Sequence, residues 1–243
     1  MIHGWVLDLS IWDREAAALR AQYRVIRMDR RGFGASSGAP DLRADAADLI
    51  RLLDRLGITR AAVVAMSQGT RVALRLAVTD PARIACLVLD GTPALDGLRG
   101  GPWHEETPLA AYRQLMRSSG IDAVRRELAA HPLMQLVTDD ARARSSLIRM
   151  LERYDGADLL APVSASDGVS AADLARLTMP VLILNGEQDV PQRLRVSAAL
   201  AREIPNAVQQ TVPAAGHLAC LDNPDAYTAR LTEFLTTQFN RRA

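Results

Sequence analysis

The sequence predicts an α/β fold in which a mostly parallel sheet is flanked by helices. Short apolar runs at 61–66, 83–89 and 181–184 alternate with segments whose apolar residues recur at helical spacing, such as 42–56. The runs are continuously apolar, which is typical of strands buried on both faces by helices. A chain of 243 residues with 49% hydrophobic content is long enough for one large domain, or for a core domain with an insertion.

The elements follow one another in a βα rhythm. Met1 and Ile2 read as the end of a buried strand that runs into a glycine turn. The further predicted strands are 24–28, 61–66, 83–89, 181–184 within 179–186, and 207–212. The predicted helices are 10–19, 42–56, one directly after residue 67, 193–203, and one that begins at Pro224.

The rhythm breaks between residues 94 and 178. No strand-like run occurs there, and helical patterns cover 109–117, 121–130 and 141–154. We therefore predict a core domain made of 1–93 and 179–243, with a helical cap at 94–178 inserted over the sheet.

Composition excludes several function classes. The 29 basic and 28 acidic residues leave a net charge of +1, which provides no field for nucleic acid or an anionic membrane. Cys86 and Cys220 match neither a zinc spacing nor a disulfide framework, as expected in a reducing compartment. No apolar run approaches the roughly 20 residues that span a bilayer, and no signal peptide is recognised. We expect a cytoplasmic protein without cofactor or metal.

A serine follows the apolar run 61–66 in the sequence Ala65-Met66-Ser67-Gln68-Gly69. This pentapeptide is one substitution from the G-x-S-x-G nucleophile elbow, in which a strained strand-to-helix turn exposes the serine. Small residues are needed on both sides because strand and helix pass close together, and Ala65 adds one methyl group where the motif has glycine. The alternative is an ordinary turn with Ser67 as a helix cap.

An activated serine needs a base and an acid that orients the base. His217 follows the last predicted strand, and Asp189 follows the strand 181–184. The order serine, aspartate, histidine is that of an α/β-hydrolase, although Asp90, at the end of the run 83–89, is a rival for the acid. The oxyanion would need backbone donors, for which the N–H groups of Gln68 and Trp5 are suitably placed.

The chain resembles, over nearly its whole length, the α/β-hydrolase group that contains small serine esterases, cofactor-free perhydrolases and enol-lactone hydrolases. The similar segments are His3-Gly4-Trp5 with 8–12, the D-x-R-G-x-G-x-S loop at 29–36, the elbow, the G-x-x-D turn at 186–189, and Gly216-His217 with 222–224. The resemblance implies that Ser67 is the nucleophile, His217 the base and Asp189 the acid, with the N–H groups of Trp5 and Gln68 as the oxyanion hole. A serine nucleophile points away from the dehalogenase and epoxide-hydrolase branches.

One departure concerns the N-terminal strands, of which only Met1-Ile2 is recognised here. Either an N-terminal portion is missing, or the gap is tolerated, or a partner chain fills it. Because a gap in a parallel sheet exposes unpaired backbone, we expect a homodimer that covers it. A stable monomer in analytical ultracentrifugation at micromolar concentration would count against this.

The function predicted is hydrolysis of a small carboxylic ester or lactone through an acyl-enzyme on Ser67. Trp103, His104 and His131 in the insertion, with Met66 beside the nucleophile, are candidates for the substrate pocket, against the alternative that they only pack. Thioester cleavage, C–C bond hydrolysis and perhydrolysis use the same triad. An alternative of another class is a non-catalytic protein that binds a small ligand on the same fold.

Overall fold

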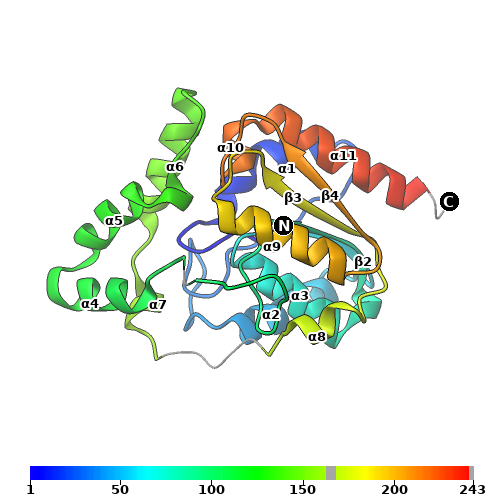
Figure 1. Cartoon of the computed structure of the whole chain (residues 1–243), viewed down its shortest axis with the longest axis horizontal. Coiled ribbons are helices and arrows are strands. Elements are labelled where there is room, and N and C mark those ends of the chain that lie inside the picture. Colours follow the sequence, from blue (N-terminus) through cyan, green and yellow to red (C-terminus); the bar gives the residue numbers. More distant parts are fainter. Residues whose placement is uncertain (105, 163–167, 241–243) are drawn as a thin grey trace.

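A parallel sheet forms the centre of the computed structural model, which describes residues 1–104, 106–162 and 168–240. Its strand order is β1-β2-β3-β4, and each neighbouring pair is parallel. Figure 1 shows this sheet between two layers of helices. The strands are β1 (Ala61–Met66), β2 (Ile84–Asp90), β3 (Val181–Gly186) and β4 (Ala207–Val212). The predicted α/β class with a parallel sheet is confirmed.

Successive residues of each strand serve opposite faces of the sheet. Val64 and Met66 pack in the cluster that includes residues of α1 (Asp13–Leu19) and α11 (Pro224–Asn240). Val63 and Ala65 pack in the other cluster, with residues from three further helices. These are α2 (Leu42–Arg55), α3 (Gly69–Thr79) and α9 (Pro191–Glu203). Burial on both faces explains why the strands read as continuous apolar runs. Two short 3-10 helices, η1 (Leu9–Trp12) and η2 (Pro81–Arg83), precede α1 and β2.

The strand predicted at 24–28 is wrong. Only Met28 forms a bridge there, to Ile2, which also bridges Ala65 of β1. Ile2 donates to the Val64 carbonyl at 2.8 Å, and the terminal amine of Met1 donates to the carbonyl of Ile26 at 2.7 Å. Among the described residues only Met1 and Ile2 pair with this segment, which makes no ladder along 24–27, and propensity without a partner does not make a strand.

An apolar groove of about 360 Å³ lies where the two segments diverge. Its walls include Val25, Ala62, Leu235 and Phe239. The homodimer expected from this gap remains a prediction.

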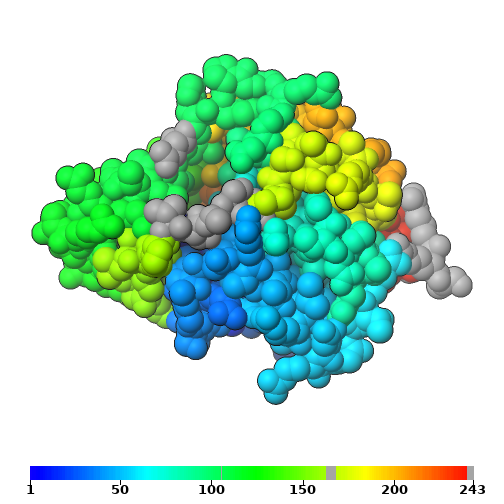
Figure 2. Space-filling model, turned by 90° about the horizontal axis from the view of Figure 1, so that it is seen from below, coloured from blue at the N-terminus to red at the C-terminus, as the bar shows by residue number. Residues whose placement is uncertain are grey.

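Helices form at 109–119, 121–130 and 141–153, close to the predicted ranges, while an inserted cap domain stays a prediction. We call the segment 109–160 the cap. It contains α4 (Leu109–Ser119), α5 (Ile121–Ala130), η3 (Pro132–Met134), α6 (Ala141–Arg153) and α7 (Ala157–Leu160). These elements project from one side of the sheet in Figure 1, and Figure 2 shows them in green beside the blue N-terminal segment.

The two ends of the predicted insertion pack with the core. Leu95, Leu98 and Val169, together with Leu174 of α8 (Ala171–Leu174), belong to the cluster that contains α3 and α9. The domain boundaries at 93 and 179 remain a prediction, and within the insertion residues 105 and 163–167 lie outside the described residues. In the part of the chain that the structure describes, no helix is both long and apolar enough to cross a membrane. Cys86 and Cys220 are both buried.

Candidate active site

Ser67 lies in a strained turn between β1 and α3. Its φ angle is 47°, a conformation that costs a non-glycine residue about 1–3 kcal/mol and needs firm support. The Ser67 N–H donates to the Asp90 carbonyl at 2.7 Å, and the Ser67 carbonyl accepts from the backbone and hydroxyl of Thr70. A Cβ on Gly69 would come within 2.4 Å of the His3 carbonyl oxygen, so glycine is required there. Ala65 is fully buried, and its methyl group fits.

The three predicted triad side chains form one hydrogen-bonded chain. His217 Nε2 lies 3.1 Å from Ser67 Oγ, and His217 Nδ1 lies 3.1 and 3.2 Å from the two carboxylate oxygens of Asp189. With the proton on Nδ1 directed at the carboxylate, Nε2 is left to accept from the serine hydroxyl. The histidine and aspartate are 3% exposed each, so these contacts are shielded from water.

Gly186 brings the acid and histidine loops together. A Cβ at this position would lie 2.0 Å from the Gly216 carbonyl oxygen, so only glycine allows the approach. Asp222 supports the histidine turn from the other side, because its carboxylate accepts from the N–H of Gly216 at 2.8 Å and from Val137 in the cap at 2.7 Å. Asp222 is the acidic residue of the segment that resembles the family's histidine region.

Asp189 is held ionised despite its burial. Burial by itself would raise its pKa, but the charge of His217 and hydrogen bonds from His217, Asn185 and Val190 lower the pKa below the usual aspartate value. The Asn185 amide donates at 3.0 Å and the Val190 N–H at 2.7 Å.

Asp90 differs from Asp189 in position and in the direction of its pKa shift. Burial, reinforced by the charge of Asp189, raises the pKa of Asp90 well above its ordinary value. Among the described residues no hydrogen bond joins it to His217. The geometry therefore brings Asp189, and not its rival, to the histidine.

Two residues that line the cavity with Ser67 have backbone N–H groups without an acceptor in the part of the chain that the structure describes. No described residue accepts from the N–H of Trp5 or of Gln68. Trp5 and Gln68 line the same cavity as Ser67, and Gln68 precedes the first residue of α3, where helix N–H groups lack intrahelical partners. The positions predicted for an oxyanion hole thus have donors available.

Arg30 connects both sides of this arrangement. Its guanidinium donates to the Gln68 side chain at 2.7 Å and forms a fully buried ion pair with Asp45 at 3.0 Å. Its N–H donates to Nε2 of His3, whose Nδ1 donates to the Gly4 carbonyl at 2.7 Å. Burial, then the charge of Arg30, lowers the pKa of His3 to about 3, so this ring is neutral.

A cavity of about 260 Å³ opens beside Ser67. The core contributes Trp5, Gln68 and Pro93 to its walls, and the predicted insertion contributes Ala94, His104, Glu106, Thr107, Leu109, Leu133 and Met134. Among the described residues no group of three or more His, Cys, Asp or Glu side chains is arranged to hold a metal ion.

Comparison with known proteins is decisive at the level of the family. Residues 1–224 match the family described as the alpha/beta hydrolase fold. The chain belongs to the alpha/beta hydrolase fold family. A pimeloyl-[acyl-carrier protein] methyl ester esterase from Pectobacterium atrosepticum is 26% identical over 246 aligned positions, which cover 96% of this chain and 92% of the relative.

Solved structures agree with the family. A thermophilic esterase from Thermogutta terrifontis, solved with malate bound, superimposes with a TM-score of 0.84 at 26% identity, covering 98% of this chain and 88% of the other. The enol-lactonase from Burkholderia xenovorans LB400 gives a TM-score of 0.81 at 23% identity, covering 97% and 90%, and shares the fold. This alpha/beta hydrolase thus has esterases among its relatives, as the sequence resemblance implied.

Of the four residues predicted for the substrate pocket of this alpha/beta hydrolase, His104 lines the cavity beside Ser67. Met66, Trp103 and His131 are not among the described residues that line it, and their part in a substrate pocket stays a prediction. His131 lines a second hollow, which shares His104, Glu106, Leu133 and Gln192 with this cavity. Met66 is buried in the core because its strand position faces the α1 and α11 layer. Trp103 donates to the Leu98 carbonyl at 2.7 Å. His131 contacts the Glu106 carbonyl at 3.0 Å and caps η3 by accepting from the Leu133 N–H.

Sequence reasoning missed two cavity residues at the start of α9, Gln192 and Arg193. Gln192 pairs with the His104 backbone through both ends of its amide. Arg193 donates to the Gly91 carbonyl at 2.6 Å, and its Nε lies 2.7 Å from a carboxylate oxygen of Glu106. The available signal was their place directly after the G-x-x-D turn, since residues that follow the acid lie at the same edge of the sheet.

Proposed function

We propose that this chain is a serine hydrolase that cleaves a small carboxylic ester or lactone, without a cofactor, through an acyl-enzyme on Ser67. The observation that carries the proposal is the buried chain from Asp189 through His217 to Ser67, with contacts of 3.1 Å at both steps. A base within hydrogen-bond reach of the nucleophile, itself oriented by a carboxylate, is the arrangement that nucleophilic catalysis needs.

In the acylation step, Ser67 Oγ attacks the ester carbonyl carbon while His217 Nε2 takes the hydroxyl proton. The carbonyl oxygen becomes an oxyanion that accepts from the N–H groups of Trp5 and Gln68, each worth on the order of 3 kcal/mol of barrier. Collapse of this intermediate breaks the bond to the leaving oxygen, which receives the proton from His217. Asp189 stabilises the imidazolium that exists in between.

In the deacylation step, His217 takes a proton from water, and the resulting hydroxide attacks the acyl carbon. The second oxyanion occupies the same pair of N–H groups, and the proton returns to Ser67 Oγ as the acid is released. For a lactone the leaving oxygen stays attached to the acyl chain, so one hydroxy acid is released.

The size of the cavity supports a small substrate. Its volume of about 260 Å³ lies below the roughly 300–1,000 Å³ of sites that take drug-sized ligands. Relatives named as esterases support ester chemistry. Arg193 and Glu106 form a paired wall of the cavity, which favours an uncharged acyl group over a strongly charged one.

Labelling and turnover together test the proposal. Wild-type protein should form a fluorophosphonate adduct on Ser67 and hydrolyse members of a panel of short esters and lactones, and Ser67→Ala should do neither. An unlabelled Ser67 in the wild type would contradict the proposal and favour a ligand-binding protein. Labelling with no hydrolysis across the panel would overturn the ester and lactone assignment in favour of thioester, C–C bond or peroxide chemistry on the same triad.

A further inference from the structure

The loop that carries Trp5 is held by side chains of the cap. The indole N–H of Trp5 donates to Oδ2 of Asp158 at 2.6 Å, and the hydroxyl of Tyr154 donates to Oδ1 of the same carboxylate at 2.7 Å. Asp158 thus has one oxygen for each ring. The ring centroids of Trp5 and Tyr154 lie 6.1 Å apart in an edge-on arrangement. The indole of Trp5, which is 8% exposed, is thus held by Asp158 of α7, a residue 153 positions later in the sequence.

The residue after Trp5 adopts a strained backbone. Val6 has a φ angle of 58°, a region that a β-branched residue almost never occupies. Such a conformation costs about 1–3 kcal/mol and persists only where the surroundings hold it. Because this strained residue directly follows Trp5, the contacts that hold the Trp5 side chain also support the turn that carries the Trp5 backbone.

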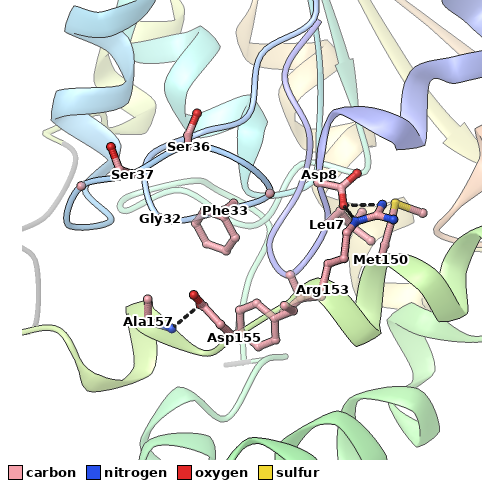
Figure 3. A pocket seen from close by; sticks show the side chains of 14 residues that line it. Leu7, Asp8, Gly32, Phe33, Ser36, Ser37, Met150, Arg153, Asp155 and Ala157 are labelled. Atoms are coloured by element: carbon pink, nitrogen blue, oxygen red, sulfur yellow. Dashed lines mark hydrogen bonds and ion pairs between the residues drawn. The ribbon is translucent and has the colours of Figure 1, made fainter.

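The contact between Trp5 and Asp158 is one tether between the cap and the N-terminal loop. An ion pair forms a second tether between them. Figure 3 shows Arg153, at the end of α6, reaching Asp8 across the pocket between the cap and the loop of Phe33. Arg153 Nε donates to Asp8 at 2.7 Å, and Nη2 donates to the hydroxyl of Ser10 at 2.8 Å. This ion pair is 47% exposed on the arginine side, so it is the weaker of the two tethers.

Asp158, the cap residue of the tether to Trp5, is itself held by hydrogen bonds from α4. Arg113 of α4 donates to the backbone carbonyls of Asp158 at 3.0 Å and Ala161 at 2.7 Å. Tyr112 on the same helix packs against the Trp5 ring at 5.6 Å between centroids. Asp158 is therefore held in place by contacts between α7 and α4.

We propose that Asp158 is a positioning residue that holds the indole of Trp5, and through it the Trp5 backbone N–H, at the oxyanion hole of this enzyme. The oxyanion hole then has one donor that depends on the sheet, at Gln68, and one that depends on the cap, at Trp5. This inference rests on the proposed function of Ser67, Trp5 and Gln68.

A donor to the oxyanion matters only when charge develops on the carbonyl oxygen, so its loss lowers kcat and leaves KM unchanged. Removing a whole donor costs about 10²–10³-fold. Misplacing one by loss of its tether should cost about 10–100-fold in kcat. A purely structural role for Asp158 would instead change thermal stability and KM, because the cap walls would loosen.

The experiment compares Asp158→Ala and Asp158→Asn with the control Asp155→Asn. Asp155 lies three residues away and accepts from the Ala157 N–H, so its variant makes the same charge change without touching Trp5. The readouts are kcat and KM on a short ester, and inhibition by a boronic acid, which forms a tetrahedral adduct, against inhibition by the product acid. The rate of fluorophosphonate labelling at Ser67 is measured in parallel.

We expect Asp158→Ala to lower kcat and boronic-acid affinity about 10–100-fold, with KM and product-acid affinity within about 3-fold. Asp158→Asn keeps an oxygen that can accept from the indole and should recover part of the loss, while Asp155→Asn should match the wild type. The proposal is overturned if Asp158→Ala matches Asp155→Asn, or if boronic-acid and product-acid affinities fall together. Failure of the proposed function would look different, as absent labelling in the wild type.

Discussion

Two strained turns flank the same cavity, and they are supported in different ways. Ser67, with φ of 47°, is held by backbone groups of the sheet and of the helix that follows it. Val6, with φ of 58°, lies between residues whose side chains are held by the cap. The sheet-supported turn should therefore keep its geometry when the cap is altered, whereas the cap-supported turn should not.

The largest loss of activity should follow substitution of the nucleophile Ser67, in the turn supported by the sheet. Ser67→Ala removes the atom that bonds to the acyl carbon and should lower kcat/KM on a short ester by about 10⁴-fold or more. Ser118→Ala, which changes an exposed serine of α4, serves as the control and should keep full activity. Retention of a tenth of wild-type activity by Ser67→Ala would rule out the nucleophile assignment.

The assignment of the triad acid can be tested by comparing substitutions of Asp189 and Asp90. Asp189→Asn cannot stabilise the imidazolium and presents a donor in place of an acceptor, so kcat should fall about 10⁴-fold. Asp90→Asn changes a carboxyl that has no hydrogen bond to His217 among the described residues, and kcat should stay within about 3-fold of the wild type. Steady-state kinetics of both variants checks this, and the reverse order of effects would transfer the role of the acid to Asp90.

Arg30 contacts residues near both strained turns, and its substitution should lower the stability of the fold. Arg30→Ala leaves the buried Asp45 carboxylate unpaired and frees both His3 and Gln68, so the free energy of unfolding should fall by about 3–5 kcal/mol. Arg31→Ala breaks a partly exposed pair with Asp48 and should cost about 0–1 kcal/mol. Urea denaturation measures both, and equal losses would show that burial of the Arg30 pair is not what matters.

A smaller, pH-dependent effect tests the helical layer behind the sheet. Burial raises the pKa of Glu15, in α1, from 4.5 to about 8, and its oxygens have no hydrogen-bond partner among the described residues. The folded protein therefore binds this proton more tightly than the unfolded chain does. As pH rises from about 4.5 to 8, the wild type should lose stability relative to Glu15→Gln, at up to about 1.4 kcal/mol per pH unit.

Above pH 8 this difference should stay constant, because Glu15 is then ionised in both the folded and the unfolded protein. Denaturation curves of the two proteins at pH 5, 6, 7 and 8 provide the measurement. Parallel stability profiles would show that Glu15 is not buried in its neutral form.

The sequence predicted the sheet-supported turn well, because its determinants are local. A buried apolar run, a serine and Gly69 describe the elbow within five residues, and the turns before Asp189 and His217 follow strands in the same way. The strand predicted at 24–28 failed for a different reason. Backbone pairing needs a partner of matching length, and that partner is not encoded in the segment itself.

The cap-supported side could not be predicted from local sequence. The contact between Trp5 and Asp158 joins residues 153 positions apart, and the pairing of Arg193 with Glu106 depends on how the insertion packs over α9. For the same reason the sequence could not show that Trp103 donates to the Leu98 carbonyl or that His131 caps η3. Side-chain direction in an insertion is decided by tertiary packing.

Capture of the acyl-enzyme tests the central claim most directly. A short p-nitrophenyl ester is mixed with wild-type protein, the reaction is quenched with acid within milliseconds, and peptides are analysed by mass spectrometry. We predict an added acyl mass on the peptide that contains Ser67, formed with the first burst of p-nitrophenol and absent in Ser67→Ala. Ester turnover without that adduct, or with the adduct on another residue, would contradict the account.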